Sequence, residues 1–206
     1  GNASGLLRVY TADDLLLINI LTGFNTTIYG IHWSPDGDKI VASGGYEDPK
    51  VIVWNLEEKS RIIINGHNRQ VRSVSWSPNG SHFASTSHHG TIRIWTPEGE
   101  LITMFKGANG GCVRIDWLDE DKIVSSCWDN TIRIYTISKT DSLLIENGNH
   151  RQKTVLAVDW HPEGNMFATG DIGNDGDTVH AVKLWTDKED LLCEMTSHQK
   201  EIYWDK

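Results

Sequence analysis

The chain has 206 residues, a formal net charge of −9, nine tryptophans and 19 glycines. The acidic balance argues against direct nucleic-acid binding, which normally needs a basic face that neutralises phosphates. No stretch approaches the roughly 18 consecutive apolar residues that span a bilayer, and the N-terminus shows no basic segment followed by an apolar run. We therefore expect an intracellular protein of the cytoplasm or nucleus, without membrane contact, whose partners are proteins.

Short runs that alternate apolar and polar residues begin near the N-terminus and continue along the chain, which is the period of β-strands. Turn clusters such as Ser34-Pro35-Asp36-Gly37 separate the runs, so we expect an all-β fold. Each complete unit contains four runs. The expected units are a partial one at 6–20, complete ones at 28–64, 71–105, 112–146 and 154–195, and the start of another at 197–206.

The units repeat with a period of about 40 residues, as the blades of a propeller do. Tryptophans end the first strand of each complete unit at positions 33, 76, 117 and 160, at intervals of 43, 41 and 43 residues. This regularity favours a role in the fold for these side chains over a ligand-binding aromatic box. A four-stranded sheet cannot bury both of its faces alone, and stacking neighbours around an axis solves that problem.

The partial unit at the N-terminus is irregular. Residues 7–11 and 15–19 resemble the second and third strands of a unit, with Ile18 in the place of the closing Trp. Ile18 lies 15 residues before Trp33, whereas the corresponding distance in the next two units is 22. We therefore expect this unit to lack its outer strand and the Gly-His turn that should follow it.

From about residue 6 to residue 203 the chain resembles a WD40 repeat protein, and the resemblance implies a β-propeller. The family stabilises each blade with a buried network of His, Ser or Thr, Asp and Trp, which is not catalytic. His89 stands where the second unit should have Asp, and no unit has the complete set. The matching positions are Ser43, Asp48 and Trp54; His67, Ser85 and Trp95; Ser125 and Asp129, with Tyr135 replacing Trp; and His150, Thr169 and Trp185.

The number of units is too small for a closed ring. Complete propellers commonly have about seven blades, or roughly 280 residues, whereas this chain carries four complete units and partial ones. An open array exposes apolar faces and unpaired strand edges at both ends. We expect an incomplete ring that is closed by another chain, by self-association or by residues outside this sequence.

The resemblance implies a non-enzymatic platform on which proteins assemble. The sequence contains no G-x-S-x-G or H-E-x-x-H motif, no Gly-rich phosphate loop with a following Lys, and no paired carboxylates at related positions, so we expect no enzyme and no cofactor. Residues 92–100 and 197–203 are more narrowly similar to transducin-β-like corepressor subunits, and this similarity implies a role in transcriptional repression. The alternative is a fragment or remnant that only completes a larger propeller.

In this family the usual contact surface is the narrow top face, formed by residues around the start of the first strand and by the turn after the second. Carried over by position, the top-face residues are Thr27, Tyr29 and Glu47; Gln70, Arg72 and His88; Gly111, Val113 and Trp128; and Thr154 and Leu156. Tyr, Trp and Arg dominate binding energy at interfaces, so Trp128, Tyr29 and Arg72 are the predicted anchors. The alternative is that Trp128 covers the edge of the neighbouring blade, since Trp is highly buried on average.

The remaining chemistry-bearing residues favour structural interpretations. Cys112, Cys127 and Cys193 show neither C-x-x-C spacing nor neighbouring His, so we expect three buried thiols without a disulfide framework or a zinc site. His88-His89 has no third ligand nearby, and we expect no metal there. The Asp- and Gly-rich stretch 170–178 lacks the frame of a calcium loop and is expected to be an exposed turn.

Overall fold

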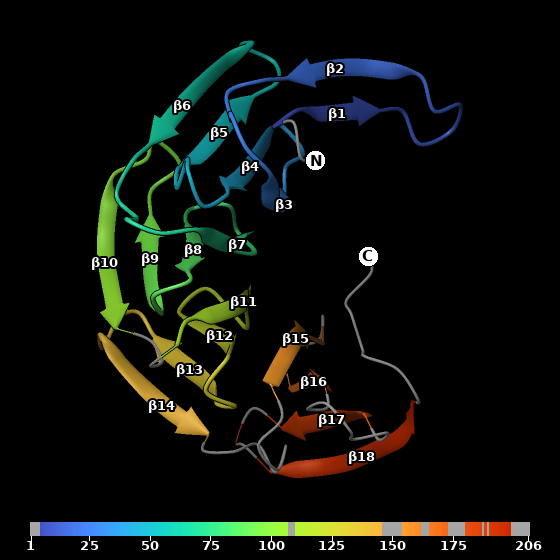
Figure 1. Ribbon diagram of the computed structural model, residues 1–206, viewed down its shortest axis with the longest axis vertical. Coiled ribbons are helices and arrows are strands. Elements are labelled where there is room, and N and C mark those ends of the chain that lie inside the picture. The colour runs from blue at the N-terminus through green and yellow to red at the C-terminus, as the bar shows by residue number, and fades with distance from the viewer. Residues whose placement is uncertain are drawn as a thin grey trace.

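The computed structural model describes residues 5–106, 110–145, 154–161, 165–172, 180–186, 188 and 190–198, and in these residues all regular structure is β. Their strands form one two-stranded hairpin and four four-stranded antiparallel sheets. The sheets follow one another around an arc whose two ends do not meet (Figure 1). The expected all-β fold of stacked four-stranded sheets in an incomplete ring is therefore confirmed.

Within each four-stranded sheet, consecutive strands pair in chain order. The N-terminal hairpin consists of β1 (Leu7–Tyr10) and β2 (Leu17–Leu21). The first sheet contains β3 (Ile28–Trp33), β4 (Lys39–Gly44), β5 (Val51–Asn55) and β6 (Ser60–Ile64). The second contains β7 (Val71–Trp76), β8 (Phe83–Ser87), β9 (Thr91–Trp95) and β10 (Leu101–Lys106). The third contains β11 (Cys112–Trp117), β12 (Lys122–Cys127), β13 (Ile132–Thr136) and β14 (Asp141–Ile145), and the fourth contains β15 (Thr154–Trp160), β16 (Met166–Ile172), β17 (His180–Thr186) and β18 (Leu191–His198).

The hydrophobic core is divided among the interfaces between neighbouring sheets. One cluster joins Val41 and Val53 of the first sheet to Trp76, Phe83 and Trp95 of the second. Similar clusters fill the next two interfaces along the arc and the interface between the hairpin and the first sheet. Because the inner strands are covered by a sheet on each side, β8 is buried along its whole length, whereas the outer strand β6 is exposed except at its last residue.

Trp33 departs from this pattern because the sheet that precedes it is incomplete. Its side chain is 46% exposed, whereas Trp76 and Trp117, at the same repeat position, are 3% and 4% exposed. Trp76 packs against strands of the preceding sheet. Among the described residues, only β1 and β2 precede β3. The preceding sheet therefore has no counterpart of β4, the strand of the first sheet that packs near Trp76. Trp33 therefore does not fill an interface between two sheets as Trp76 does.

The hairpin contains the last two strands of a unit, not the second and third. Leu7 lies opposite Leu21 in β1–β2, as Val51 lies opposite Ile64 in β5–β6. Phe24 follows β2 where the second unit has its His before β7, and Phe24 is buried. The prediction of a missing outer strand is therefore wrong, because β2 occupies the position of the outer strand.

The second sheet joins three of the expected network residues by hydrogen bonds. Nε1 of Trp95 donates to Oγ of Ser85 at 2.8 Å, and Nε2 of His67 lies 2.7 Å from the same oxygen. Nδ1 of His67 lies 3.3 Å from the hydroxyl of Thr91, while His89 is exposed. Thr91 thus supplies the contact that the resemblance assigns to Asp.

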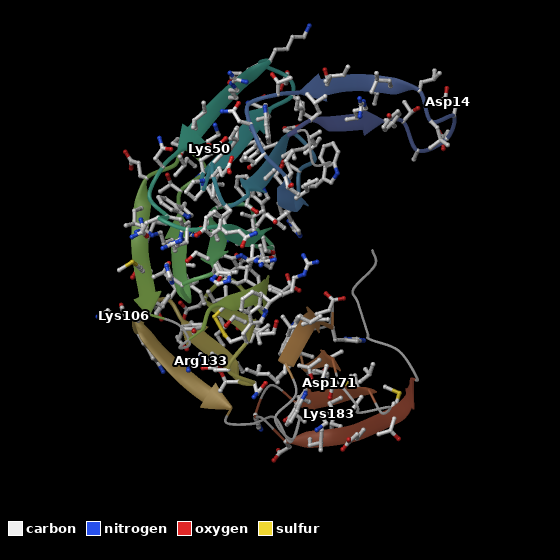
Figure 2. All side chains as sticks on the ribbon, viewed as in Figure 1. Asp14, Lys50, Lys106, Arg133, Asp171 and Lys183 are labelled. Atoms are coloured by element: carbon white, nitrogen blue, oxygen red, sulfur yellow. A yellow bond between two sulfur atoms is a disulfide. The ribbon has the colours of Figure 1, made fainter. Side chains whose placement is uncertain are left out.

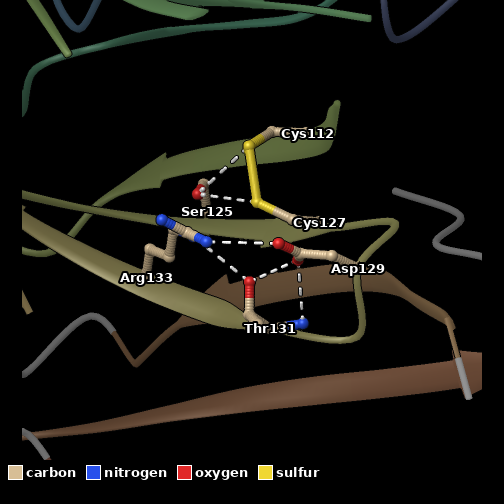
Figure 3. Close-up of polar contacts among 6 residues, drawn as sticks. All are labelled: Cys112, Ser125, Cys127, Asp129, Thr131 and Arg133. Carbon is tan, nitrogen blue, oxygen red and sulfur yellow. Dashed lines mark hydrogen bonds and ion pairs between the residues drawn. A yellow bond between two sulfur atoms is a disulfide. The ribbon is translucent and has the colours of Figure 1, made fainter. Parts of the chain in front are cut away.

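The third sheet has a disulfide near the corresponding place, between Cys112 of β11 and Cys127 of β12 (Figure 3). Ser125 Oγ lies 3.8 Å from the sulfur of Cys112 and 3.5 Å from that of Cys127. The two cysteines are directly opposite each other in the strand register, so their side chains meet on one face. The expectation of three buried free thiols is wrong on two counts, because these two are bonded and Cys193 is exposed.

Asp129, the other matched residue of the third unit, lies in the turn between β12 and β13. Its carboxylate accepts a hydrogen bond from the hydroxyl of Thr131 and pairs with Arg133, with 3.1 Å between Oδ2 and the guanidinium nitrogen (Figure 3). This side chain therefore holds the turn, and it is not joined to Ser125 by a hydrogen bond in the described residues.

The matched residues of the first sheet are also occupied locally. Ser43 Oγ accepts the backbone N–H of Gly30 at 3.0 Å. Asp48 accepts the backbone N–H of Asn25 at 3.1 Å and pairs with Lys50 at 2.8 Å, so it anchors the turn that enters β3. Trp54 is buried.

In the fourth sheet, Nε1 of Trp185 donates to the hydroxyl of Thr169 at 2.9 Å. Lys183 is only 1% exposed and its ammonium lies 3.9 Å from a carboxylate oxygen of Glu194. Figure 2 shows Lys183 and Asp171 on β17 and β16 of this sheet. His150, residues 173–178 of the Asp- and Gly-rich stretch, and residues 199–206 of the expected further blade lie outside the described residues.

Candidate partner-binding face

A β-bulge recurs at the start of the first strand of every four-stranded sheet. In the second sheet Val71 lies opposite Ser87 and Ser73 lies opposite Thr86, which leaves Arg72 without a residue opposite it. The residues left over in this way are Tyr29, Arg72, Val113 and Leu156. Because a bulge re-aims the side chain that it carries, the repeat places four reoriented side chains at one edge of the arc. The position of the strand starts predicts all four of them as top-face residues.

Arg72 lies between two aromatic rings. Its guanidinium carbon is 5.0 Å from the ring centroid of Tyr29 and 5.0 Å from that of Trp128. The ring of His88 meets Trp128 edge to face, with 4.6 Å between centroids. Tyr29 comes from the first sheet, Arg72 and His88 from the second, and Trp128 from the third. We refer to these four residues as the Arg72 cluster.

Equivalent turns hold His88 and Trp128 in place. The backbone N–H of His88 donates to the carbonyl oxygen of Gln70 at 2.9 Å, and that of Trp128 donates to the carbonyl oxygen of Gly111 at 3.0 Å. Gly111 has a φ of 98°, and a Cβ at this position would collide with the carbonyl oxygen of His88. Glycine is therefore required for the third sheet to approach the turn that carries His88.

The cluster is polar but is not neutralised by an acidic group. Nε of Arg72 is buried and has no hydrogen-bond partner, and the ion pairs among the described residues do not include Arg72. Burial is the main cause that lowers the pKa of His88, and the positive charge of Arg72 adds to it. Since the ordinary value is 6.5, the His88 ring is neutral at pH 7.

Arg69 and Tyr46, which the repeat pattern does not predict as contact residues, extend the cluster towards the first sheet. Arg69 donates to the hydroxyl of Tyr46, and its guanidinium carbon lies 5.5 Å from the Tyr46 ring centroid. Both side chains are exposed. Tyr46 lies in the turn between β4 and β5, which is three residues longer than the turn between β8 and β9. That extra length was the available signal for an additional residue on this face.

Other predicted contact residues fall in different environments. Gln70 is only 6% exposed, so its assignment as a contact residue is wrong; the side chain is turned into the protein. Glu47 is exposed, whereas Thr27, Val113 and Leu156 are half-buried. The side chain of Thr154 lies outside the described residues.

Trp128 is half-buried and not freely exposed, because it packs against Arg72 and His88 of the neighbouring sheet. It therefore does contact the next blade, as the alternative interpretation expects, and part of its surface stays open to solvent. A packed but accessible ring is suited to a contact surface because little conformational freedom is lost on binding.

A separate hollow lies on the inner side of the arc. Its volume is about 410 Å³, and its lining comes from the first strands of the four sheets, with Trp33, Arg114 and Asp116 among the lining residues. The hydroxyl of Ser75 in the second sheet donates to a carboxylate oxygen of Asp116 in the third sheet at 3.1 Å. None of the four residues of the Arg72 cluster lines this hollow. The described residues include no group of three or more His, Cys, Asp or Glu side chains placed to hold a metal ion. They also contain no helix that is long and apolar enough to cross a membrane.

An arc of four-stranded sheets, each built from the same sequence unit, defines the chain as a propeller-type repeat protein. The family described as WD domain, G-beta repeat matches residues 16–55, 58–96, 99–136 and 142–179, and the chain belongs to this family. The first three matches each run from an outer strand through the third strand of the next sheet. The first match begins at β2, in agreement with the position of β2 as an outer strand.

The chain is 28% identical over 183 residues to WD repeat-containing protein 90 of Xenopus tropicalis, an alignment that covers 84% of this chain and 8% of that protein. It is 30% identical over 129 residues to the mouse protein of the same name, covering 58% and 7%. It is 23% identical over 181 residues to Coronin-like protein crn1 of Schizosaccharomyces pombe, covering 82% and 30%. The chain thus spans less than a third of the length of these relatives.

WD repeat domains typically act as protein-interaction scaffolds, and the family match indicates no catalytic family. The matches lend no support to the narrower resemblance to transducin-β-like corepressor subunits.

Proposed function

We propose that this chain is a scaffold module that binds a protein or peptide partner through the Arg72 cluster. The observation that carries the proposal is the guanidinium of Arg72, held 5.0 Å from each of the rings of Tyr29 and Trp128. Arg, Tyr and Trp are the residue types that most often supply the large energies of an interface. Here three consecutive sheets bring one of each together at the bulged edge of the arc.

The packing of the cluster supports this use. Tyr29 is 40% exposed although its ring contacts Arg72, so it offers apolar area to a partner without first having to be ordered. Side chains that are already immobilised lose less entropy on binding, at about 0.5 to 1.5 kcal/mol for each flexible side chain. The cluster is therefore preorganised for contact.

A second role follows from the open ends of the arc. Trp33 is 46% exposed on the first sheet, and Leu15, Leu16 and Ile18 of the hairpin region are between 55% and 74% exposed. Apolar area of this kind favours additional strands that complete the ring, from another chain or a second copy. In this role the chain contributes structure to a larger propeller, and the Arg72 cluster need not bind anything.

The proposal is tested by selecting peptides from a random phage-displayed library on the folded chain and measuring the Kd of the best binders. We expect Trp128→Ala to weaken binding by about 2 kcal/mol, or roughly 30-fold, because it removes a central aromatic contact. Met104→Ala is the matched control, since Met104 is 42% exposed on the outer strand β10.

Trp128 also packs within the molecule, so Tyr29→Ala is measured beside it and the melting temperature of each variant is recorded. Weaker binding at an unchanged melting temperature supports the proposal. Selected peptides that bind both aromatic variants as well as the unaltered chain would exclude the Arg72 cluster as the binding surface and leave the structural role.

A further inference from the structure

Arg72 carries a positive charge in a setting that lacks its own counter-charge. Its Nε is buried without a hydrogen-bond partner, and the ion pairs within the described part of the chain involve other cations. Burying an unpaired polar group costs free energy unless a partner satisfies it. The rings of Tyr29 and Trp128 compensate in part through cation–π attraction to the guanidinium.

We infer that Arg72 is the recognition point for a carboxylate, supplied by an Asp or Glu side chain of the bound peptide. This inference rests on the proposed function and names the chemistry of its partner. A guanidinium presents several N–H donors in a planar fork that matches the two oxygens of a carboxylate. Because Nε is buried, the ligand has to use the terminal nitrogens of Arg72.

The number of charges at the site selects a carboxylate over a phosphate. His88 is the only other basic side chain of the cluster, and burial holds its pKa below the ordinary 6.5, so Arg72 is the cation that the cluster presents at pH 7. The nearby Arg69 already donates to the hydroxyl of Tyr46 and is exposed, where water screens its charge. One fixed charge fits a group of charge −1, whereas a phosphate carries about −1.5 to −2 at pH 7.

The net charge of −9 does not prevent this recognition. At physiological ionic strength the charges separated by more than about 8 Å are largely screened, so an incoming carboxylate responds mainly to its immediate neighbours. Glu47 is the exposed acid in the turn that carries Tyr46, and the ion pairs among the described residues do not join it to Arg72. Charge local to the cluster therefore decides the outcome.

The experiment uses the peptides obtained from the library selection. Each Asp or Glu is replaced in turn by Asn or Gln, which keeps the size and removes the charge. At the anchoring position we expect the affinity for the unaltered chain to fall about tenfold or more, as for loss of a charge-assisted hydrogen bond. The same replacement should change the affinity for Arg72→Met less than about twofold, since the cation is then absent.

Arg69→Gln is the matched control, because it removes a neighbouring arginine and should leave the Asp or Glu preference intact. Arg72→Lys keeps the charge but loses the planar fork, and should show an intermediate preference. The melting temperature of each variant confirms that the fold persists. Besides the selected peptides and their Asn or Gln variants, a further set of peptides carries phosphoserine at the anchoring position.

The outcomes separate this inference from the proposed function. Peptides that depend on Trp128 and Tyr29 but tolerate every Asp and Glu replacement would overturn the carboxylate inference and leave the binding surface in place. Phosphoserine peptides that bind at least tenfold more tightly than the acidic ones would replace the carboxylate by a phosphate. Peptides whose affinity is unchanged by both Trp128→Ala and Tyr29→Ala would overturn the proposed function itself.

Discussion

The second and third sheets share one register but contain different chemistry at the same place. In the second sheet the hydroxyl of Ser85 is shared by His67 and Trp95 at 2.7 and 2.8 Å. In the third sheet the equivalent hydroxyl of Ser125 faces a disulfide. The buried serine is the constant feature, and its partners can be hydrogen-bonding rings or sulfur. The repeat thus conserves the position of the buried contact, while the residue types that make the contact differ between sheets.

The first sheet gives a third solution at this place. Phe24 stands at the position of His67 and packs against Trp54 with 6.0 Å between ring centroids, close to the 6.3 Å between His67 and Trp95. The contact between two rings is kept although the hydrogen bond is lost. Packing of the aromatic pair is therefore common to the two sheets, and the polar network is an addition to it.

The largest effect on stability is expected when Trp95, the aromatic residue of the hydrogen-bond network in the second sheet, is truncated. Trp95→Ala should lower the free energy of unfolding by about 3 to 5 kcal/mol, because Trp95 is 3% exposed and fills the interface between two sheets. Denaturant unfolding followed by circular dichroism measures it. Trp33→Ala is the control, since Trp33 is 46% exposed and should cost less than about 1 kcal/mol. A loss below that size at Trp95 would mean that this interface is not the core.

The next largest effect tests whether the disulfide stabilises the third sheet as the hydrogen-bond network stabilises the second. Cys112→Val with Cys127→Ser introduces the residues that the second sheet has at the paired positions Val71 and Ser87. We expect a loss of about 3 kcal/mol, since the bond closes a loop with a sequence separation of 15 residues.

Cys193→Ser is the control for that pair, because Cys193 is exposed and should leave unfolding unchanged. The comparison uses protein purified under oxidising conditions, with the disulfide verified by mass spectrometry after alkylation. Equal stability of the double variant and the unaltered chain would show that packing alone holds the start of β11 against β12.

The repeat period predicts the four-stranded sheets because the closing tryptophans and the turn clusters recur together. It does not predict the register of the hairpin, since third and fourth strands share a side-chain period of two. Ile18-Asn19 resembles the Trp-Asp pair that closes a third strand, and this resemblance favours the wrong strand assignment. Tyr10 is the better match, because it lies 23 residues before Trp33 and Tyr135 shows that Tyr can occupy this position.

The disulfide and the Arg72 cluster could be foreseen only in part. Cys112 and Cys127 stand at the repeat positions of Val71 and Ser87, which lie opposite each other in the second sheet. This pairing can be deduced only when the bulge at the start of the first strand is known. The strand starts identify Tyr29, Arg72 and Trp128 as candidates. Their meeting depends on the bulges and on the angle between three sheets, which no local pattern encodes.

The smallest predicted effect concerns the charge of His67, which distinguishes the second sheet from the first. Burial, together with the charge of Arg93, lowers the pKa of His67 from its ordinary value of 6.5 to about 3. The folded state therefore holds the neutral ring, whereas the unfolded chain binds a proton below about pH 6.5. This contribution is fully present above pH 6.5 and is lost as the pH falls towards 3.

Between pH 7 and pH 5 the linkage amounts to a loss of about 2 kcal/mol, at about 1.4 kcal/mol for each pH unit below the unfolded value. Other groups titrate in this range, so the measurement is the difference between the unaltered chain and His67→Phe, which copies Phe24 of the first sheet. The variant keeps the contact with Trp95 and has no ring to protonate, and its free energy of unfolding should fall less between the two pH values. If both proteins lose the same stability, the His67 ring is either protonated in the fold or accessible to water, and the second sheet gains no pH dependence from its network.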